Sequence, residues 1–307
     1  MMFYNFRLVI IGTIFFAMLT TMINCSKKEA AKNSIQIKGS DTEVNLVQKL
    51  SEVYMEKLPE VSIAVTGGGS GTGIAALING QTDIANSSRP MKNAEIKQAN
   101  AKGIEPVPIM FALDGLAIIT HESLSVNSLN INEVADIFKG NIKNWKSVGG
   151  PDLEISVYGR QSNSGTFVYF RDTVLKGDYA PSVRRMNGTA QIVEAVRKDK
   201  AAIGYVGIGY VVNEEGNVIS GINVLNLAGD ANTTGVSPLE SENVKSGKYP
   251  LSRPLFQYTN GKPEGNLLEF IQFELSDEGQ KLIEKEGYYP ITNKHMAHNR
   301  SLGLIKD

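Results

Sequence analysis

The sequence predicts an α/β protein built as two lobes, and three observations indicate this class. The 307 residues are 42% hydrophobic and 21% charged, which is an ordinary globular composition. At roughly 150 residues per domain, this length suggests about two lobes, each with a core of its own. After Ser34, short apolar runs alternate with amphipathic runs, a pattern typical of α/β structure.

Residues 1–24 differ from the rest and are predicted to be a secretory signal. Arg7 is the only charged residue before Lys27, and Leu8–Ile23 is an almost continuous apolar run. A positive start followed by a short apolar stretch is typical of an export signal. The alternative is a membrane anchor, but the run is shorter than the ~20 residues that span a bilayer.

Cys25, the single cysteine, directly follows this apolar run and has no partner for a disulfide bond. The run Met22–Cys25 resembles a bacterial lipoprotein cleavage site, which implies that Cys25 is lipidated and becomes the first residue. Residues 25–34 are then a polar tether, and the protein is exported and anchored to a cell membrane, facing the periplasm or the cell exterior. An ordinary secreted protein is the alternative.

The first part of the mature chain repeats a strand followed by a helix. Val44, Val47 and Leu50 recur at helical spacing, so a helix is predicted over Thr42–Leu58, and Pro59 ends it. The other predicted elements are strands at Ile35–Lys38, Val61–Val65, Ile84–Asn86 and Ile104–Val107, a helix ending at Asn79, and a long apolar strand, Gly115–Thr120, that leaves the first lobe.

The rest of the chain has the same alternation. Lys245–Pro254 is rich in turn formers and is predicted to carry the chain back, and Leu267–Lys285 is predicted to be one amphipathic helix packed on the first lobe. The other predicted elements are helices at Ile131–Phe138 and Ala190–Lys198, a helix after the loop Arg160–Thr166 that ends at Leu175, and strands at Ile155–Tyr158 and Ala202–Val206.

Three polar loops each lead from a strand into a helix: Gly39–Thr42, Gly69–Gly73 and Asn163–Thr166. A helix N-terminus has unpaired N–H groups and a partial positive charge, so it favours anions. Each loop alone is better explained as a capped helix start. Three such loops near an arginine, either Arg160 or Arg89, predict an oxyanion site.

Other function classes are excluded by what the sequence lacks. The net charge is −1, with 31 basic against 32 acidic residues and no basic tract, which argues against nucleic acid as a partner. No lysine follows the glycine-rich loop, and its glycines do not match the dinucleotide spacing. There are only three histidines, and His295 and His298 lie near the C-terminus without cysteine or carboxylate company, so we expect no metal, no cofactor and no catalytic residue.

The chain resembles the phosphate-binding proteins of bacterial ABC importers, the PstS type, over roughly Ile35–Pro290. The segments that match in order and spacing are Gly39–Thr42, Gly69–Ile74, Asp83–Pro90, Arg160–Thr166 and Ala202–Val206. The resemblance implies a two-lobe periplasmic-binding-protein fold of type II, with mixed sheets flanked by helices and phosphate in the interlobe cleft. It also implies a non-enzymatic monomer that delivers phosphate to a membrane permease, with residues 35–119 plus 250–307 as lobe 1 and 120–249 as lobe 2.

The candidate phosphate-binding residues come from the matching loops and from their polar neighbours. They are Ser40, Asp41, Thr42, Ser70, Gly71, Thr72, Ser88, Arg89, Asp114, Arg160, Ser164, Gly165 and Thr166.

The sequence departs from the family pattern at two positions. Many members have an aspartate at the position of Ser88, where it accepts the proton of hydrogen phosphate, and another at the position of Ser162, where it pairs with the arginine. We therefore hypothesise that Asp41, or secondly Asp114, accepts that proton and separates phosphate from sulfate. An unnamed group is expected to steady Arg160. Sulfate or molybdate binding, an adhesin, and a phosphate-ester hydrolase on the same scaffold are the alternatives.

Overall fold

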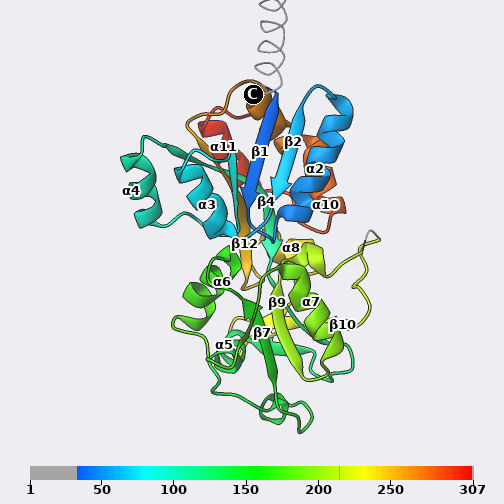
Figure 1. Ribbon diagram of the computed structural model, residues 1–307. Helices are drawn as coiled ribbons and strands as arrows, with labels where there is room; N and C mark the ends of the chain where they lie inside the picture. The colour runs from blue at the N-terminus through cyan, green and yellow to red at the C-terminus, as the bar shows by residue number, and fades with distance from the viewer. Residues whose placement is uncertain (1–32, 214, 306–307) are drawn as a thin grey trace, which may run out of the picture.

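The computed structural model describes residues 33–213 and 215–305, which form two groups of elements joined at a narrow waist (Figure 1). The first group, the sheet A half, contains two separate stretches of the chain. Its elements are β1 (Ser34–Gly39), α2 (Val44–Lys57), β2 (Ser62–Thr66), α3 (Ser70–Ile78), β3 (Ile84–Ser87), α4 (Asn93–Ala101), β4 (Pro106–Gly115), β12 (Ser252–Asn260), α9 (Gly265–Leu275), α10 (Asp277–Lys285) and α11 (Asn293–Ser301).

Sheet A has the strand order β2-β1-β3-β12-β4. β1 is parallel to β2 and β3, whereas β12 is antiparallel to β3 and β4. Helices α2 and α10 lie on one side of the sheet, and α3 and α4 lie on the other (Figure 1). The sheet is covered on both faces, so its central strands are buried, as in other α/β proteins.

The second group, the sheet B half, is built on the strand order β10-β5-β9-β7-β8, with a separate β11-β6 ribbon. A short helix, α8 (Ser241–Lys245), contacts β4 at the waist. The elements of this half are β5 (Ala117–His121), β6 (Ser128–Asn130), α5 (Ile131–Phe138), η1 (Trp145–Val148), β7 (Ser156–Arg160), α6 (Gly165–Phe170), η2 (Arg171–Leu175), β8 (Arg184–Met186), α7 (Thr189–Lys198), β9 (Ala202–Val206), η3 (Ile208–Tyr210), β10 (Ile222–Val224) and β11 (Asn226–Ala228).

The mixed α/β class with two helix-flanked sheets is confirmed, and several predicted boundaries are wrong. The apolar run is divided at Leu116, so that β4 ends sheet A and β5 begins in sheet B, which places residues 117–119 outside the half predicted for them. Ser34, predicted to end the tether, is already in β1. The predicted helix ending at Leu175 becomes π-helical from Arg171, and Leu267–Lys285 is two helices.

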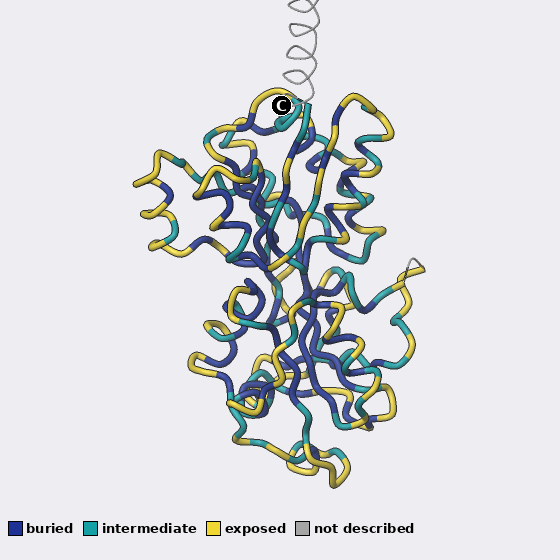
Figure 2. The backbone as a smooth tube through the Cα atoms, in the orientation of Figure 1, coloured by how far each residue is buried: buried dark blue, intermediate teal, exposed yellow. Residues whose placement is uncertain are grey.

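Most residues at the waist are buried, as the dark blue stretches of the tube in Figure 2 show. Between residues 33 and 305, leaving out residue 214, no helix is long and apolar enough to cross a membrane. The predicted signal, Cys25 and nearly all of the tether lie outside the described residues.

Candidate functional site

The loop after β1 is the first part of the site, and Gly39 shapes it. Gly39 has a φ of 147°, and a Cβ on it would lie 2.1 Å from the carbonyl oxygen of Asn86, so only glycine fits. Ser40 N–H donates to the same Asn86 oxygen at 3.0 Å. The chain therefore turns tightly over the end of β3 and presents Asp41 and Thr42 toward the sheet B half.

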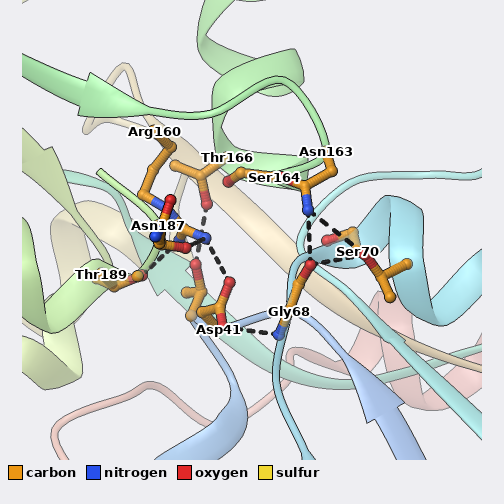
Figure 3. A network of polar contacts seen from close by, with 12 residues as sticks. Asp41, Gly68, Ser70, Arg160, Asn163, Ser164, Thr166, Asn187 and Thr189 are labelled. Atoms are coloured by element: carbon orange, nitrogen blue, oxygen red, sulfur yellow. Dashed lines mark hydrogen bonds and ion pairs between the residues drawn. The ribbon is translucent and has the colours of Figure 1, made fainter. Parts of the chain in front are cut away.

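Asp41 pairs with Arg160 across the two halves (Figure 3). The other oxygen of Asp41, Oδ1, accepts from Gly68 N–H at 2.8 Å. Arg160 is also held within its own half, because its Nη1 donates to Thr189 Oγ1 at 2.8 Å and its Nη2 to the carbonyl of Asn187 at 2.9 Å. Asp41 is thus the carboxylate that steadies Arg160, a partner that the sequence alone did not identify.

Four hydroxyl groups form a continuous chain between the halves. Thr42 Oγ1 lies 2.9 Å from Thr166 Oγ1, which lies 3.3 Å from Ser88 Oγ, which in turn lies 3.4 Å from Ser70 Oγ. All four residues are buried. Hydroxyl groups can rotate to donate to a bound oxyanion, so this chain is a set of buried donors that four separate loops supply.

The halves also touch through backbone and glycine contacts beside the hydroxyl chain. Gly71 N–H donates to the carbonyl of Asn163 at 2.9 Å, and Asn163 Nδ2 donates to the carbonyl of Gly68 at 2.9 Å. A Cβ on Gly165 would lie 2.2 Å from Ser70 Oγ. A larger side chain at Gly165 would therefore separate the two halves at this point.

Arg160 has a buried donor that the protein leaves unused. Its Nε lies below the surface without a hydrogen-bond partner in the described structure. Its backbone N–H donates to Tyr205 Oη at 3.1 Å, and burial raises the pKa of Tyr205 to about 12. Tyr205 is therefore a neutral phenol at physiological pH. The guanidinium is rigidly placed beside the hydroxyl chain, an arrangement suited to binding an anion.

The comparisons with known proteins agree with this geometry. A family model described as a PBP superfamily domain matches residues 26–278. The phosphate-binding protein PstS of Pseudomonas aeruginosa is 32% identical to the chain, and the match covers 87% of this chain and 86% of that protein. This chain belongs to the PstS family of phosphate-binding proteins.

Further relatives in the PstS family match over similar lengths. PstS of Bacillus subtilis is 31% identical, with 89% of this chain and 85% of that protein covered. The structure of a protein from Clostridium perfringens, described as a phosphate ABC transporter substrate-binding protein with bound phosphate, matches with a TM-score of 0.74 and 30% identity. That match covers 85% of this chain and all of the solved chain. The predicted family and fold are therefore both confirmed.

Arg89 is placed differently from what the sequence predicted for this PstS-family chain. Its two terminal nitrogens donate to the carboxylate of Glu95 at 2.7 and 2.8 Å, and Glu95 also accepts from Lys92 N–H at the start of α4. The Arg89 guanidinium is thus paired with a carboxylate of its own half, whereas the Arg160 guanidinium is paired with a carboxylate of the opposite half. The sequence did not reveal this because α4, which positions Glu95, was not predicted.

Asp114 is likewise engaged, at the end of β4. It is fully buried, its Oδ2 accepts from Nε and Nη2 of Arg253 at 2.9 and 2.8 Å, and its Oδ1 accepts from Ile208 N–H at 2.9 Å. With three donors already bound, Asp114 has less free hydrogen-bonding capacity than Asp41, which accepts two. Arg253 itself was missed because it lies in a stretch that was predicted to be turns.

The remaining candidate residues shape the loops of the site. Ser164 caps α6, since its Oγ accepts from Phe167 N–H at 3.3 Å. Thr72 Oγ1 donates to the carbonyl of Gly68 at 2.7 Å, within the glycine-rich loop. Across the described residues no cluster of three or more His, Cys, Asp or Glu side chains could hold a metal.

Proposed function

We propose that this protein binds inorganic phosphate between its two halves and delivers it to the permease of an ABC-type importer. The observation that supports this most is the buried hydroxyl chain of Thr42, Thr166, Ser88 and Ser70 beside the Arg160 guanidinium. A tetrahedral oxyanion can accept several hydrogen bonds at once, and charged partners strengthen each of them. The named relatives are phosphate-binding proteins, and one was solved with phosphate bound.

The donors come from both halves, so binding requires the halves to close. Thr42, Ser70 and Ser88 belong to the sheet A half, and Arg160 and Thr166 belong to the sheet B half. We place the hinge where the chain passes between the sheets, at Leu116 and just before β12. The two crossings are adjacent, because Leu116 N–H donates to the carbonyl of Leu251 at 3.1 Å. Two short adjacent connections of this kind allow domain closure around a ligand.

The proposed activity is binding without chemical change. The histidines among the described residues make local contacts away from Arg160, such as His298 with the carbonyl of Pro108 at 3.0 Å. The hydroxyl groups beside Arg160 bond to one another, to backbone groups and to Arg253. None of the four hydroxyl groups of Thr42, Thr166, Ser88 and Ser70 has a carboxylate or histidine partner in the described structure that would make it a nucleophile.

We further propose that Cys25 carries a lipid that anchors the protein at the cell surface or in the periplasm. The apolar run before Cys25 and the polar stretch after it support this proposal. A Cys25→Ser variant is expected to leave the membrane fraction and appear in the soluble exported fraction. Retention of this variant on the membrane would contradict lipid anchoring.

The binding proposal is tested by exchanging Arg160 for lysine, which keeps the charge but loses the planar fork. We expect Arg160→Lys to weaken phosphate binding by about 10-fold or more, because a lysine cannot hold Asp41, Asn187 and Thr189 together. The matched control is Arg197→Lys, an exchange on α7 of the same half, where Arg197 bonds to Glu194 and Ser220. Equal phosphate affinity in both variants would contradict the assignment of Arg160.

A further inference from the structure

Arg253 is a second guanidinium at the site, and neither the sequence motifs nor the family resemblance pointed to it. It lies on β12, just after the chain returns to sheet A, and its side chain is 2% exposed. Four of its five N–H groups are used, by Asp114 twice, by the carbonyl of Ser88 at 3.1 Å and by Thr166 Oγ1 at 3.1 Å. The contact with Thr166 joins sheet A to the one member of the hydroxyl chain that lies in the other half.

The guanidinium plane of Arg253 is fixed from two sides. Asp114 Oδ2 accepts from Nε and Nη2, which sets the direction of the fork. The ring of Tyr169 lies with its centroid 5.0 Å from Cζ, a cation–π contact, and Tyr169 Oη reaches the carbonyl of Ser252 at 3.4 Å. The Nη2 hydrogen that meets Thr166 therefore has little freedom to point elsewhere.

The chemistry of a hydroxyl determines what this contact does. Thr166 Oγ1 has one hydrogen to donate and two lone pairs, and an arginine can only donate. Thr166 must therefore accept from Arg253, so its own hydrogen is left for Thr42, Ser88 or a bound oxyanion. Without Arg253, nothing on this side of Thr166 Oγ1 would turn the hydroxyl hydrogen away, and it could point in more directions.

We propose that Arg253, oriented by Asp114, is a positioning residue: by donating to Thr166 Oγ1, it turns the hydroxyl hydrogen of Thr166 away from the guanidinium and toward the bound phosphate. This inference rests on the proposed function, because it names a further determinant of the same site. Asp114 lies on β4 and Arg253 on β12, the two strands next to the proposed hinge. Their ion pair therefore connects the hinge with Thr166 and the other hydroxyl donors. Its charges balance, so it adds direction to the site without adding net charge.

A double-mutant cycle tests the proposal, with phosphate affinity measured by calorimetric titration of the full protein. Arg253→Lys is expected to weaken phosphate binding by about 10-fold in the native background, since one ammonium cannot serve Asp114, Ser88 and Thr166 together. In a Thr166→Val background, which has no hydroxyl to orient, the same exchange should cost less than about 2-fold. In a Thr166→Ser background, which retains the hydroxyl, the 10-fold loss should return.

The outcomes separate the inference from the proposed function. An equal fold-loss in the native and Thr166→Val backgrounds would show that Arg253 only supports the fold, and would overturn the inference, as would undiminished affinity in Arg253→Lys. If Arg253→Lys does not fold, Asp114→Asn replaces it in the same cycle, because it loosens the hold on Arg253 while keeping the arginine. Absence of phosphate binding by the native protein would instead contradict the proposed function.

Discussion

Asp41 illustrates how much one side chain contributes to the site. Both of its oxygens already accept a hydrogen bond, from Gly68 N–H and from Arg160. Each oxygen still has a second lone pair, which can accept the proton of hydrogen phosphate. Asp41 therefore has more free hydrogen-bonding capacity than Asp114, and it also ties the halves together.

Replacing Asp41 by asparagine separates these two roles. We expect Asp41→Asn to weaken phosphate binding by about 10-fold or more, because it leaves the buried Arg160 without its counter-charge. If Asp41 also accepts the phosphate proton, the preference for phosphate over sulfate should fall as well. Titration of the variant with both anions checks this. Weaker binding with an unchanged preference would leave Asp41 as the partner of Arg160 and would rule it out as the selective acceptor.

Glu43, two residues after Asp41, is fully buried and contributes to the pH dependence of stability. Burial raises the pKa of its carboxyl well above the ordinary 4.5, with Ser40 and Arg253 opposing the shift and Asp114 and Glu274 reinforcing it. The folded protein thus keeps a proton on Glu43 that the unfolded chain loses above about pH 4.5. The contribution of Glu43 to stability is complete below that pH and declines as the pH rises toward the folded-state pKa.

Glu43→Gln should remove this decline. Relative to the native protein, the variant should gain stability between pH 4.5 and pH 7, by at most about 1.4 kcal/mol per pH unit. Urea unfolding at several pH values measures the difference. The matched control is Glu52→Gln on the exposed face of α2, which should show no such trend. A stability difference that does not change with pH would contradict a neutral Glu43.

Arg160 also shows what the sequence could predict at the residue scale. Its place in the run Arg160–Thr166 and the helix that follows were enough to nominate it. Its partner could not be predicted, because Asp41 lies 119 residues away in the other half. Arg253 was hidden for a similar reason, since its contacts depend on how β12 returns to sheet A.

At the scale of elements, the sequence predicted best where local pattern and burial agree. The predicted helix Ile131–Phe138 has the bounds of α5, and the predicted strand Ala202–Val206 has the bounds of β9. The helical run that begins at Leu267 was read as continuous because its apolar spacing continues. Ser276 ends α9 and caps α10, with its Oγ accepting from Gly279 N–H at 3.2 Å. The following acidic pair, Asp277 and Glu278, is the signal that could have revealed the break.

β12 could not be predicted because Pro254 argues against a central strand. β3 pairs only with residues Phe256–Tyr258 of β12, so at Pro254 the strand has β4 as its single neighbour. Just after Pro254, the register of β12 against β4 shifts between Leu255 and Phe256. The missing N–H of proline is tolerated there because the second neighbour begins only after it.

The start of α6 provides an element-scale test of closure. In Gly165→Ala, the new Cβ would lie 2.2 Å from Ser70 Oγ and 2.8 Å from Ser88 Oγ, both in the opposite half. The helix itself accepts alanine, so we expect about 10-fold or greater loss of phosphate affinity with little change in the unfolding temperature without phosphate. Calorimetry and thermal unfolding measure the two quantities.

Gly229→Ala is the matched control for that exchange, because its nearest neighbour, Thr233 Oγ1, is 3.9 Å away. Native affinity in Gly165→Ala would show that Ser70 and Gly165 need not meet. A large drop in the unfolding temperature without phosphate, seen together with the lost affinity, would assign the effect to folding rather than to closure.

At the scale of the whole molecule, contacts between the halves extend beyond the anion-binding loops. Tyr210 of η3 donates to the carbonyl of Asp41 at 2.5 Å, and a Cβ on Gly207 would lie 2.6 Å from a methyl group of Thr42. The loop after β1 thus meets both Arg160 and η3 of the sheet B half. The structure is a closed arrangement, and we infer that a bound anion stabilises it by accepting donors from both halves.

The most direct test of this account is calorimetric titration of the protein, dialysed free of phosphate, with phosphate and then with sulfate at neutral pH. We expect one phosphate bound per chain and no measurable response to sulfate. Sulfate binding as tight as phosphate would contradict selection through the phosphate proton, and no response to either anion would contradict phosphate binding by this protein.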